Sequence, residues 1–296
     1  MPPKRIPPVP TRPVRLELFD IQGHNGDKPL DYSAFFQFIE SLSGRDRQET
    51  IADRVVIVPV FNRREGVYFF SAYMGSPGSS ILVVDLANGE EELRAVERGK
   101  LVATRTVGVI DPKRRLAVVQ YVHSGVRAPQ IAALFEKLGH SSDDFEGATL
   151  EFAPRAANAF RTQLSEFERI QSVSLTLTRP NYDWSDYPDA LNGLAADSNA
   201  HNVSVEASAS RSQALSKTGG VVKVLRELIS GHGQRSILKS AEVKGNREGE
   251  DFLTSLKLSK LTQTKLANVE LSGGLPNGDA VRNAALAYLS GIEEPK

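Results

Sequence analysis

Residues 54–122 alternate between apolar runs and short turn sequences, and this pattern limits the fold more than any other feature of the chain. The runs have the length and composition of β-strands, and Asn62 to Gly66 forms a predicted hairpin loop between the first two. Pro59 interrupts the first run and indicates an edge or a bulge. We therefore expect a meander of about five antiparallel strands. The runs cover residues 55–61, 67–74, 81–86, 101–110 and 115–122.

Acidic residues interrupt this stretch at Glu90 to Glu97. We expect either a short helix or a solvated acidic loop in this segment. A metal site is a poorer interpretation, because the side chains of consecutive carboxylates do not converge on one ion.

The rest of the chain mixes helical and strand patterns. Asp31 is a plausible N-cap, and Ser172 to Thr178 alternates strictly between polar and apolar residues, as a half-buried antiparallel strand does. This mixture predicts an α+β fold with an antiparallel, strand-rich N-terminal lobe at 14–169 and a second lobe of alternating strands and helices at 170–296. Helices are expected over 31–42, 129–138, 156–167, 221–230, 251–258 and 279–289, and further strands over 15–21, 148–153, 237–243 and 266–271.

Six prolines fall in the first thirteen residues, together with Lys4, Arg5 and Arg12. Proline lacks a backbone N–H and has a fixed φ, so this stretch suits neither a helix nor a sheet ladder. We expect residues 1–13 to form a disordered, basic, proline-rich arm.

Several function classes are excluded or disfavoured by composition. The chain has no cysteine, which rules out disulfides, cysteine-ligated zinc, iron–sulfur clusters and thiol nucleophiles. No apolar run is long enough to span a bilayer, and the N-terminus lacks the apolar core of a signal peptide, so a cytoplasmic location is expected. The 36 basic and 36 acidic side chains cancel, and any affinity for a polyanion must therefore come from uneven distribution.

No motif for a cofactor or a metal emerges. Lys217 to Gly220 lacks the glycine spacing of nucleotide-binding loops, Gly75-Ser76-Pro77 does not fit a hydrolase elbow, and the histidines lack ligand spacing. We expect no cofactor, no metal and no catalytic residue. A metal-dependent nuclease remains an alternative, because Asp183, Asp186 and Asp189 cluster in sequence.

Charge is distributed unevenly in the second half of the chain. Residues 180–210 carry five acidic and no basic residues, whereas 211–247 carry eight basic residues and only two acidic ones. A basic segment with interspersed serines is typical of a surface that follows phosphates, and the absence of a recognition helix predicts binding that depends on backbone and shape. The candidate DNA-binding residues are Arg211, Lys217, Lys223, Arg226, Arg235, Lys239 and Lys244, with Lys223 and Arg226 expected on the polar side of the 221–230 helix.

The order of the predicted elements and a few short sequence fragments resemble those of a known protein family. The relevant fragments are Arg105-Thr106-Val107, Lys137 to Ser142, Leu150-Glu151 with Pro154-Arg155, and Arg169 leading into Val173. With these the chain resembles the RexA-like proteins of phage exclusion and phage defence. The resemblance implies a cytoplasmic, dimeric, two-lobed protein that binds DNA without marked sequence preference and triggers a membrane or effector partner, without inserting into the membrane itself. It assigns no DNA-contacting residue.

The leading hypothesis is a non-enzymatic DNA-binding sensor or regulator of a phage-exclusion system. Besides the nuclease, a protein interaction component that uses the proline-rich arm and the acidic 180–210 segment remains an alternative.

Overall fold

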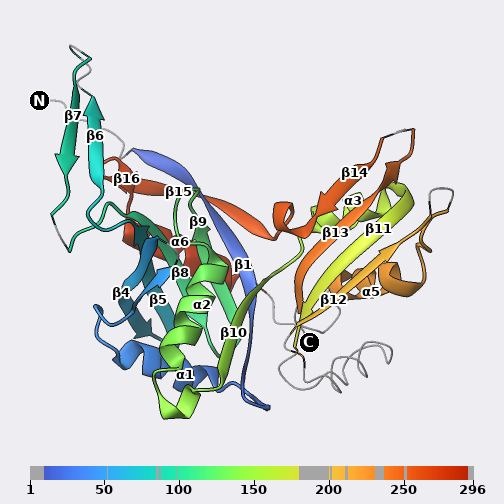
Figure 1. Ribbon diagram of the computed structural model, residues 1–296, viewed down its shortest axis with the longest axis horizontal. Coiled ribbons are helices and arrows are strands. Elements are labelled where there is room, and N and C mark those ends of the chain that lie inside the picture. The colour runs from blue at the N-terminus through green and yellow to red at the C-terminus, as the bar shows by residue number, and fades with distance from the viewer. Residues whose placement is uncertain are drawn as a thin grey trace, which may run out of the picture.

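The computed structural model describes residues 10–51, 53–84, 87, 89–97, 99–179, 200, 202–210, 213–230, 237–249 and 252–292. Its strands pair antiparallel, and the strand-rich α+β class expected from the sequence is confirmed. Two sheets lie side by side, each with its own helices (Figure 1). Among the described residues, no helix is both long and apolar enough to cross a bilayer.

The larger sheet is organised around β1 (Thr11–Asn25). One edge of β1 pairs with β9, and the other edge pairs first with β15 and then with β10. The strands follow the order β16-β15-β1-β9-β8-β5-β4-β3, with β10 and β2 also paired to β1. Their bounds are β2 Lys28–Pro29, β3 Gln48–Ile51, β4 Arg54–Arg64, β5 Val67–Gly75, β8 Thr104–Asp111, β9 Leu116–Tyr121, β10 Ala148–Pro154, β15 Thr264–Ser272 and β16 Leu275–Pro276.

Helices cover both faces of this larger sheet. On one face lie α1 (Tyr32–Ser41) and α2 (Ala128–Gly139), which bury Phe36 and Phe135 against Phe61 of β4. On the other face α6 (Gly278–Ser290) packs on β8 and β9. Side-chain caps define two of the helix starts, since Asp31 and Asn277 each accept hydrogen bonds from two backbone N–H groups. A short 3-10 helix, Asp143–Phe145, follows α2.

The chain leaves the larger sheet at the end of β10. There Arg155 donates two hydrogen bonds, of 2.8 and 2.7 Å, to the fully buried Asp20 carboxylate of β1. Such a bidentate pair is among the stronger hydrogen-bonded contacts in proteins. The smaller sheet follows, in the order β12-β11-β13-β14. Its elements are α3 Asn158–Ser165, β11 Phe167–Thr178, β12 Asn202–Ser208, α5 Gly220–Ser230, β13 Leu238–Arg247, β14 Thr254–Lys257 and a 3-10 helix at Leu258–Lys260.

The last residues of the predicted proline-rich arm form part of a strand, contrary to expectation. Strand β1 begins at Thr11, and Thr11 to Pro13 pair with β15. A proline cannot donate a backbone hydrogen bond, but its carbonyl still accepts one, as Pro10 does from the N–H of Leu271. The expectation for residues 1–9 lies outside the described residues.

Three local predictions are wrong. The run at 81–86 does not join the meander, since its described part lies in β6 (Ser80–Val84), outside the larger sheet. The acidic segment 90–97 contains a strand, β7 (Glu91–Ala95), which pairs with β6 in a separate two-stranded ribbon. The segment 251–258 contains β14 and the start of a 3-10 helix in place of an α-helix, because hydrogen bonding to β13 outweighs its weak helical pattern.

The boundary expected at residue 170 also differs from the course of the chain. From Thr264 onward the chain returns to the larger sheet, where β15 pairs with β1 and α6 covers the adjoining strands. Sequence periodicity identified these elements but carried no information about which sheet they join.

Candidate nucleic-acid interface

In the part of the chain that the structure describes, helices cover the smaller sheet on one face only. Val173, Leu175 and Leu177 of β11 face α3 and α5 and pack in a core with Val222 and Leu225 of α5. The alternating side chains point the other way, and those of Ser172, Ser174 and Thr176 and of their cross-strand neighbours are exposed or half-buried. We call this surface the open face. It is formed by Ser172, Ser174, Thr176, Ser204, Glu206, Ser208, Ser240, Glu242, Lys244, Ser255 and Lys257.

Strand register arranges the open face in rows across the strands. One row runs through Ser208, Ser172, Lys244 and Ser255, and the next through Glu206, Ser174, Glu242 and Lys257. A third row joins Ser204, Thr176 and Ser240. The open face therefore presents many hydroxyl groups together with two lysines and two glutamates at regular cross-strand spacing.

Glu242 lies between the two lysines. The Nζ atoms of Lys244 and Lys257 are each 3.6 Å from its Oε1, and Ser255 donates a hydrogen bond to the same oxygen at 2.8 Å. That hydrogen bond, aided by the two ammonium groups, lowers the pKa of Glu242. Two cations thus share one carboxylate, and the side chains of Lys244 and Lys257 are 52% and 45% exposed. This trio carries a positive excess toward solvent.

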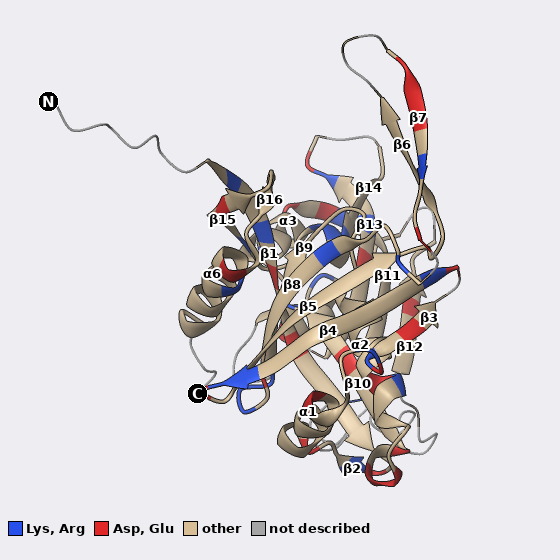
Figure 2. Cartoon of the chain, turned by 90° about the vertical axis from the view of Figure 1, so that its left-hand side faces the viewer, with Lys and Arg blue, Asp and Glu red and all other residues tan. Residues whose placement is uncertain are grey.

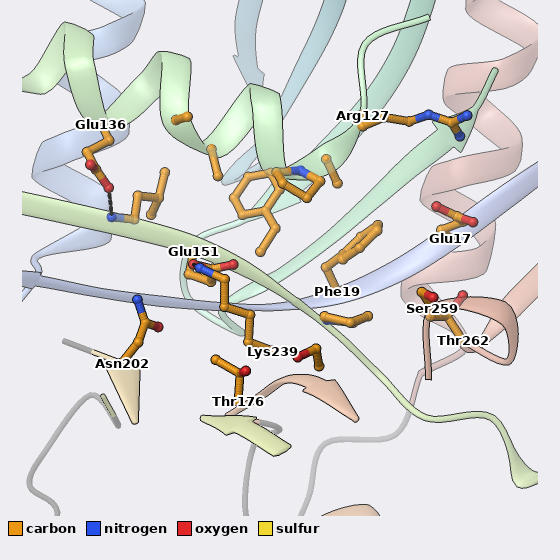
Figure 3. A pocket seen from close by; sticks show the side chains of 18 of the residues that line it. Glu17, Phe19, Arg127, Glu136, Glu151, Thr176, Asn202, Lys239, Ser259 and Thr262 are labelled. Carbon is orange, nitrogen blue, oxygen red and sulfur yellow. Dashed lines mark hydrogen bonds and ion pairs between the residues drawn. The ribbon is translucent and has the colours of Figure 1, made fainter. Parts of the chain in front are cut away.

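A cleft of about 740 Å³ adjoins the open face, between the two sheets (Figure 3). Thr176 and Ser240 belong to both the open face and the cleft wall, to which Asn202, Lys239 and Ser259 also contribute. Residues of α2, β10, β1 and β9 form the opposite wall. The open face and the cleft are therefore one continuous surface.

Lys239 crosses this cleft. Because Thr176 pairs with Ser240 and Leu177 with Leu238, Lys239 is the extra residue of a β-bulge. Its Nζ reaches Glu151 of β10 at 2.8 Å and so links the two sheets. The bulge explains why the side chain of Lys239 does not follow the alternation of buried and open-face side chains along β13.

The interior of the cleft is more apolar than its rim. Phe19, Phe152 and Pro129 contribute to its lining. Near the rim, the guanidinium carbon of Arg127 lies 4.0 Å from the centre of the Tyr121 ring, as in a cation–π contact. Burial raises the pKa of Glu17 there, an effect opposed by Arg15 and Arg127. The cleft therefore offers apolar contacts bounded by charged groups.

The structure divides the candidate basic residues between two sides of the smaller sheet. Lys239 and Lys244 lie on β13 and face the cleft or the open face. Lys217 precedes α5, and Lys223 lies on α5 with an ion pair to Glu227 at 3.6 Å, in the helix layer behind the sheet. Arg226 is half-buried, so it is less exposed than expected for the polar side of the helix. Arg211 and Arg235 lie outside the described residues. The described basic residues of the segment 211–247 thus do not share one surface.

Two residues of the interface were missed because their segment was predicted to be helical. Ser255 and Lys257 reach the open face only in a strand beside β13. By contrast, Ser172, Ser174 and Thr176 form the polar side of a strand whose alternation is visible in the sequence, and that signal could have identified an uncovered sheet face.

The carboxylates of the nuclease alternative, Asp183, Asp186 and Asp189, lie outside the described residues. Within the part of the chain that the structure describes, no group of three or more His, Asp and Glu residues is placed to hold a metal ion. The expectation that the protein uses no metal stays a prediction.

No protein-family model matches the chain, and a comparison with curated proteins gives no match either.

Proposed function

We propose that this protein binds nucleic acid without sequence preference and holds the sugar-phosphate backbone along the open face. The observation that carries this proposal is a sheet face that no described helix covers, with hydroxyls in every cross-strand row and with Lys244 and Lys257 on either side of Glu242. Serine, threonine and lysine side chains are common donors to phosphate oxygens.

The composition of the open face favours backbone contacts over base contacts. The described residues that define it are Ser, Thr, Lys and Glu, without an aromatic ring for stacking or an arginine for bidentate contact with guanine. Its three cross-strand rows repeat similar hydroxyl groups, which suits a polymer with repeating phosphates. Affinity should therefore depend on salt more than on sequence.

The cleft adds a pocket for a nucleic-acid base to the proposed backbone-binding site. Its interior contacts Phe19, Phe152 and Pro129, and it opens beside Thr176 and Ser240 of the open face. An unpaired base of a strand that lies on the open face could enter the cleft, whereas a base inside a duplex remains stacked. This arrangement favours single-stranded over double-stranded nucleic acid.

The resemblance to phage-exclusion proteins is compatible with this binding activity. A role as a sensor in phage defence, a homodimeric state, a cytoplasmic location and an effector partner stay predictions from that resemblance. The nuclease alternative is tested in the same experiment if each binding reaction is run with and without magnesium and the oligonucleotide is then analysed for cleavage.

The test is the salt dependence of binding, measured by fluorescence anisotropy with labelled oligonucleotides. In the double variant Lys244→Gln/Lys257→Gln, affinity should fall for all sequences, and on a single strand the log–log salt slope should become shallower by about 1.4 units, at about 0.7 per phosphate contact. The control is Lys217→Gln/Lys223→Gln, which removes the same charge from the helix side. Equal losses in both variants, or a loss only in the control, would place binding elsewhere.

A further inference from the structure

The β6–β7 ribbon projects from the rest of the molecule (Figures 1 and 2). Leu82, Val84 and Leu93 lie on one side of it and are 56%, 48% and 70% exposed. A two-stranded ribbon alone is marginally stable in water, and three or more strands with an apolar face are usually needed. This ribbon therefore has the features of an element that is completed by another chain.

The outer edge of β7 is available for such pairing. In the described part of the chain, β7 pairs only with β6, and every residue from Glu91 to Ala95 is exposed. An open strand edge carries backbone N–H and C=O groups that can pair with another strand.

The sequence of β7 is complementary to itself. In an antiparallel pair of two β7 strands with Leu93 at the two-fold axis, Glu92 lies opposite Arg94 of the partner subunit, and Arg94 opposite the partner's Glu92. Both side chains already lie on one side of the ribbon, where Arg94 Nη2 is 2.9 Å from Glu92 Oε2. Opposite charges directly across a strand pair stabilise it, whereas like charges destabilise it.

We infer that β7 pairs antiparallel with β7 of a second copy of this chain, which joins the two ribbons in one four-stranded sheet. Since Leu82 lies opposite Leu93 within each ribbon, the new sheet carries a continuous row of four leucines. The opposite side carries two cross-strand pairs of Glu92 and Arg94, flanked by Ile81 and Val83. This symmetric arrangement is a closed, isologous interface.

The outer edge of β6 is a less specific alternative. Ile81 to Val84 is apolar throughout and contains no charge that would fix a register. The charges of β7, by contrast, favour the symmetric register centred on Leu93 over those centred on Glu92 or Arg94, which place like charges opposite each other.

Charge reversal tests the pairing directly by sedimentation analysis over a roughly hundredfold range of concentration. The wild-type protein should dimerise. Glu92→Arg or Arg94→Glu alone places like charges opposite each other and should raise the dissociation constant by about tenfold or more. The double variant Glu92→Arg/Arg94→Glu restores complementarity and should recover the dimer. Failure of the double variant to recover, with the ribbon still folded, would contradict the pairing.

A second measurement uses the absence of cysteine from the chain. Leu93→Cys places two thiols at the two-fold axis, and mild oxidation should give a disulfide-linked dimer. Leu275→Cys is the control, because Leu275 is similarly exposed, at 66%, but lies on β16. A monomeric wild-type protein at all concentrations, or equal cross-linking at both positions, would overturn the inference.

Discussion

The two sheets of this protein differ in how they are covered. The larger sheet has α1 and α2 on one face and α6 on the other, so its strands contribute to cores on both sides. Among the described residues, the smaller sheet has helices on one face only, and its other face is polar. An antiparallel sheet tolerates one solvated face, so this asymmetry is stable without a further layer. The comparison shows that the larger sheet buries apolar side chains on both faces, whereas the smaller sheet does so on one face and leaves the other for the proposed binding.

The largest expected difference between the two sheets is in how much a substitution lowers the stability of the protein. Phe135 is fully buried among Phe36, Phe61 and Phe70, with ring centroids 5.2 to 6.1 Å away. Phe135→Ala should lower the free energy of unfolding by about 3–5 kcal/mol because it leaves a cavity. Ser174→Ala on the open face should change it by no more than about 0.5 kcal/mol. Denaturant titrations measure both, and a large loss from Ser174→Ala would show that the open face is structurally required.

A smaller effect is expected at the cleft, where the two sheets meet. Ala133 of α2 is exposed and lines the cleft, so Ala133→Phe should fill part of it without disturbing the core. If a base enters the cleft, affinity for a single strand should fall by about tenfold, comparable to the loss of one base-stacking contact. Duplex affinity should not change. Anisotropy with both oligonucleotides measures the difference, and equal affinities for wild type and variant would exclude the cleft from binding.

The smallest expected effect is a pH dependence at Glu17. Burial raises the pKa of this carboxyl in the folded protein, so its contribution to stability is greatest below the unfolded-state pKa and is lost as pH rises through the folded-state pKa. Glu17→Gln removes this dependence. From about pH 4 to about pH 7 the variant should therefore gain stability relative to wild type, by less than about 1 kcal/mol. Melting curves at both pH values test the sign, and a relative loss at pH 7 would contradict it.

Local patterns in the sequence predicted many elements of the fold. The Asp31 cap, the apolar spacing of α2 and the alternation of β11 all reflect interactions between residues close in sequence. Partner choice between distant segments could not be predicted in the same way. The pairing of β15 with β1 and the strand conformation of 254–257 depend on hydrogen bonds to strands elsewhere in the chain.

The candidate site was predicted only in part for the same reason. A cluster of basic residues in sequence does not show which side chains share a surface, and Lys223 and Lys244 lie on different sides of one sheet. The register between β13 and β14 is what places Lys257 beside Lys244 and Glu242.

Lysine acetylation of the wild-type protein, with and without an oligonucleotide, tests the nucleic-acid interface most directly. Mass spectrometry measures the reaction at each lysine, so both sides of the smaller sheet are compared in one sample. The open-face account predicts that nucleic acid protects Lys244 and Lys257 and leaves Lys217 and Lys223 reactive. Protection of Lys217 and Lys223 with Lys244 and Lys257 still reactive would contradict it.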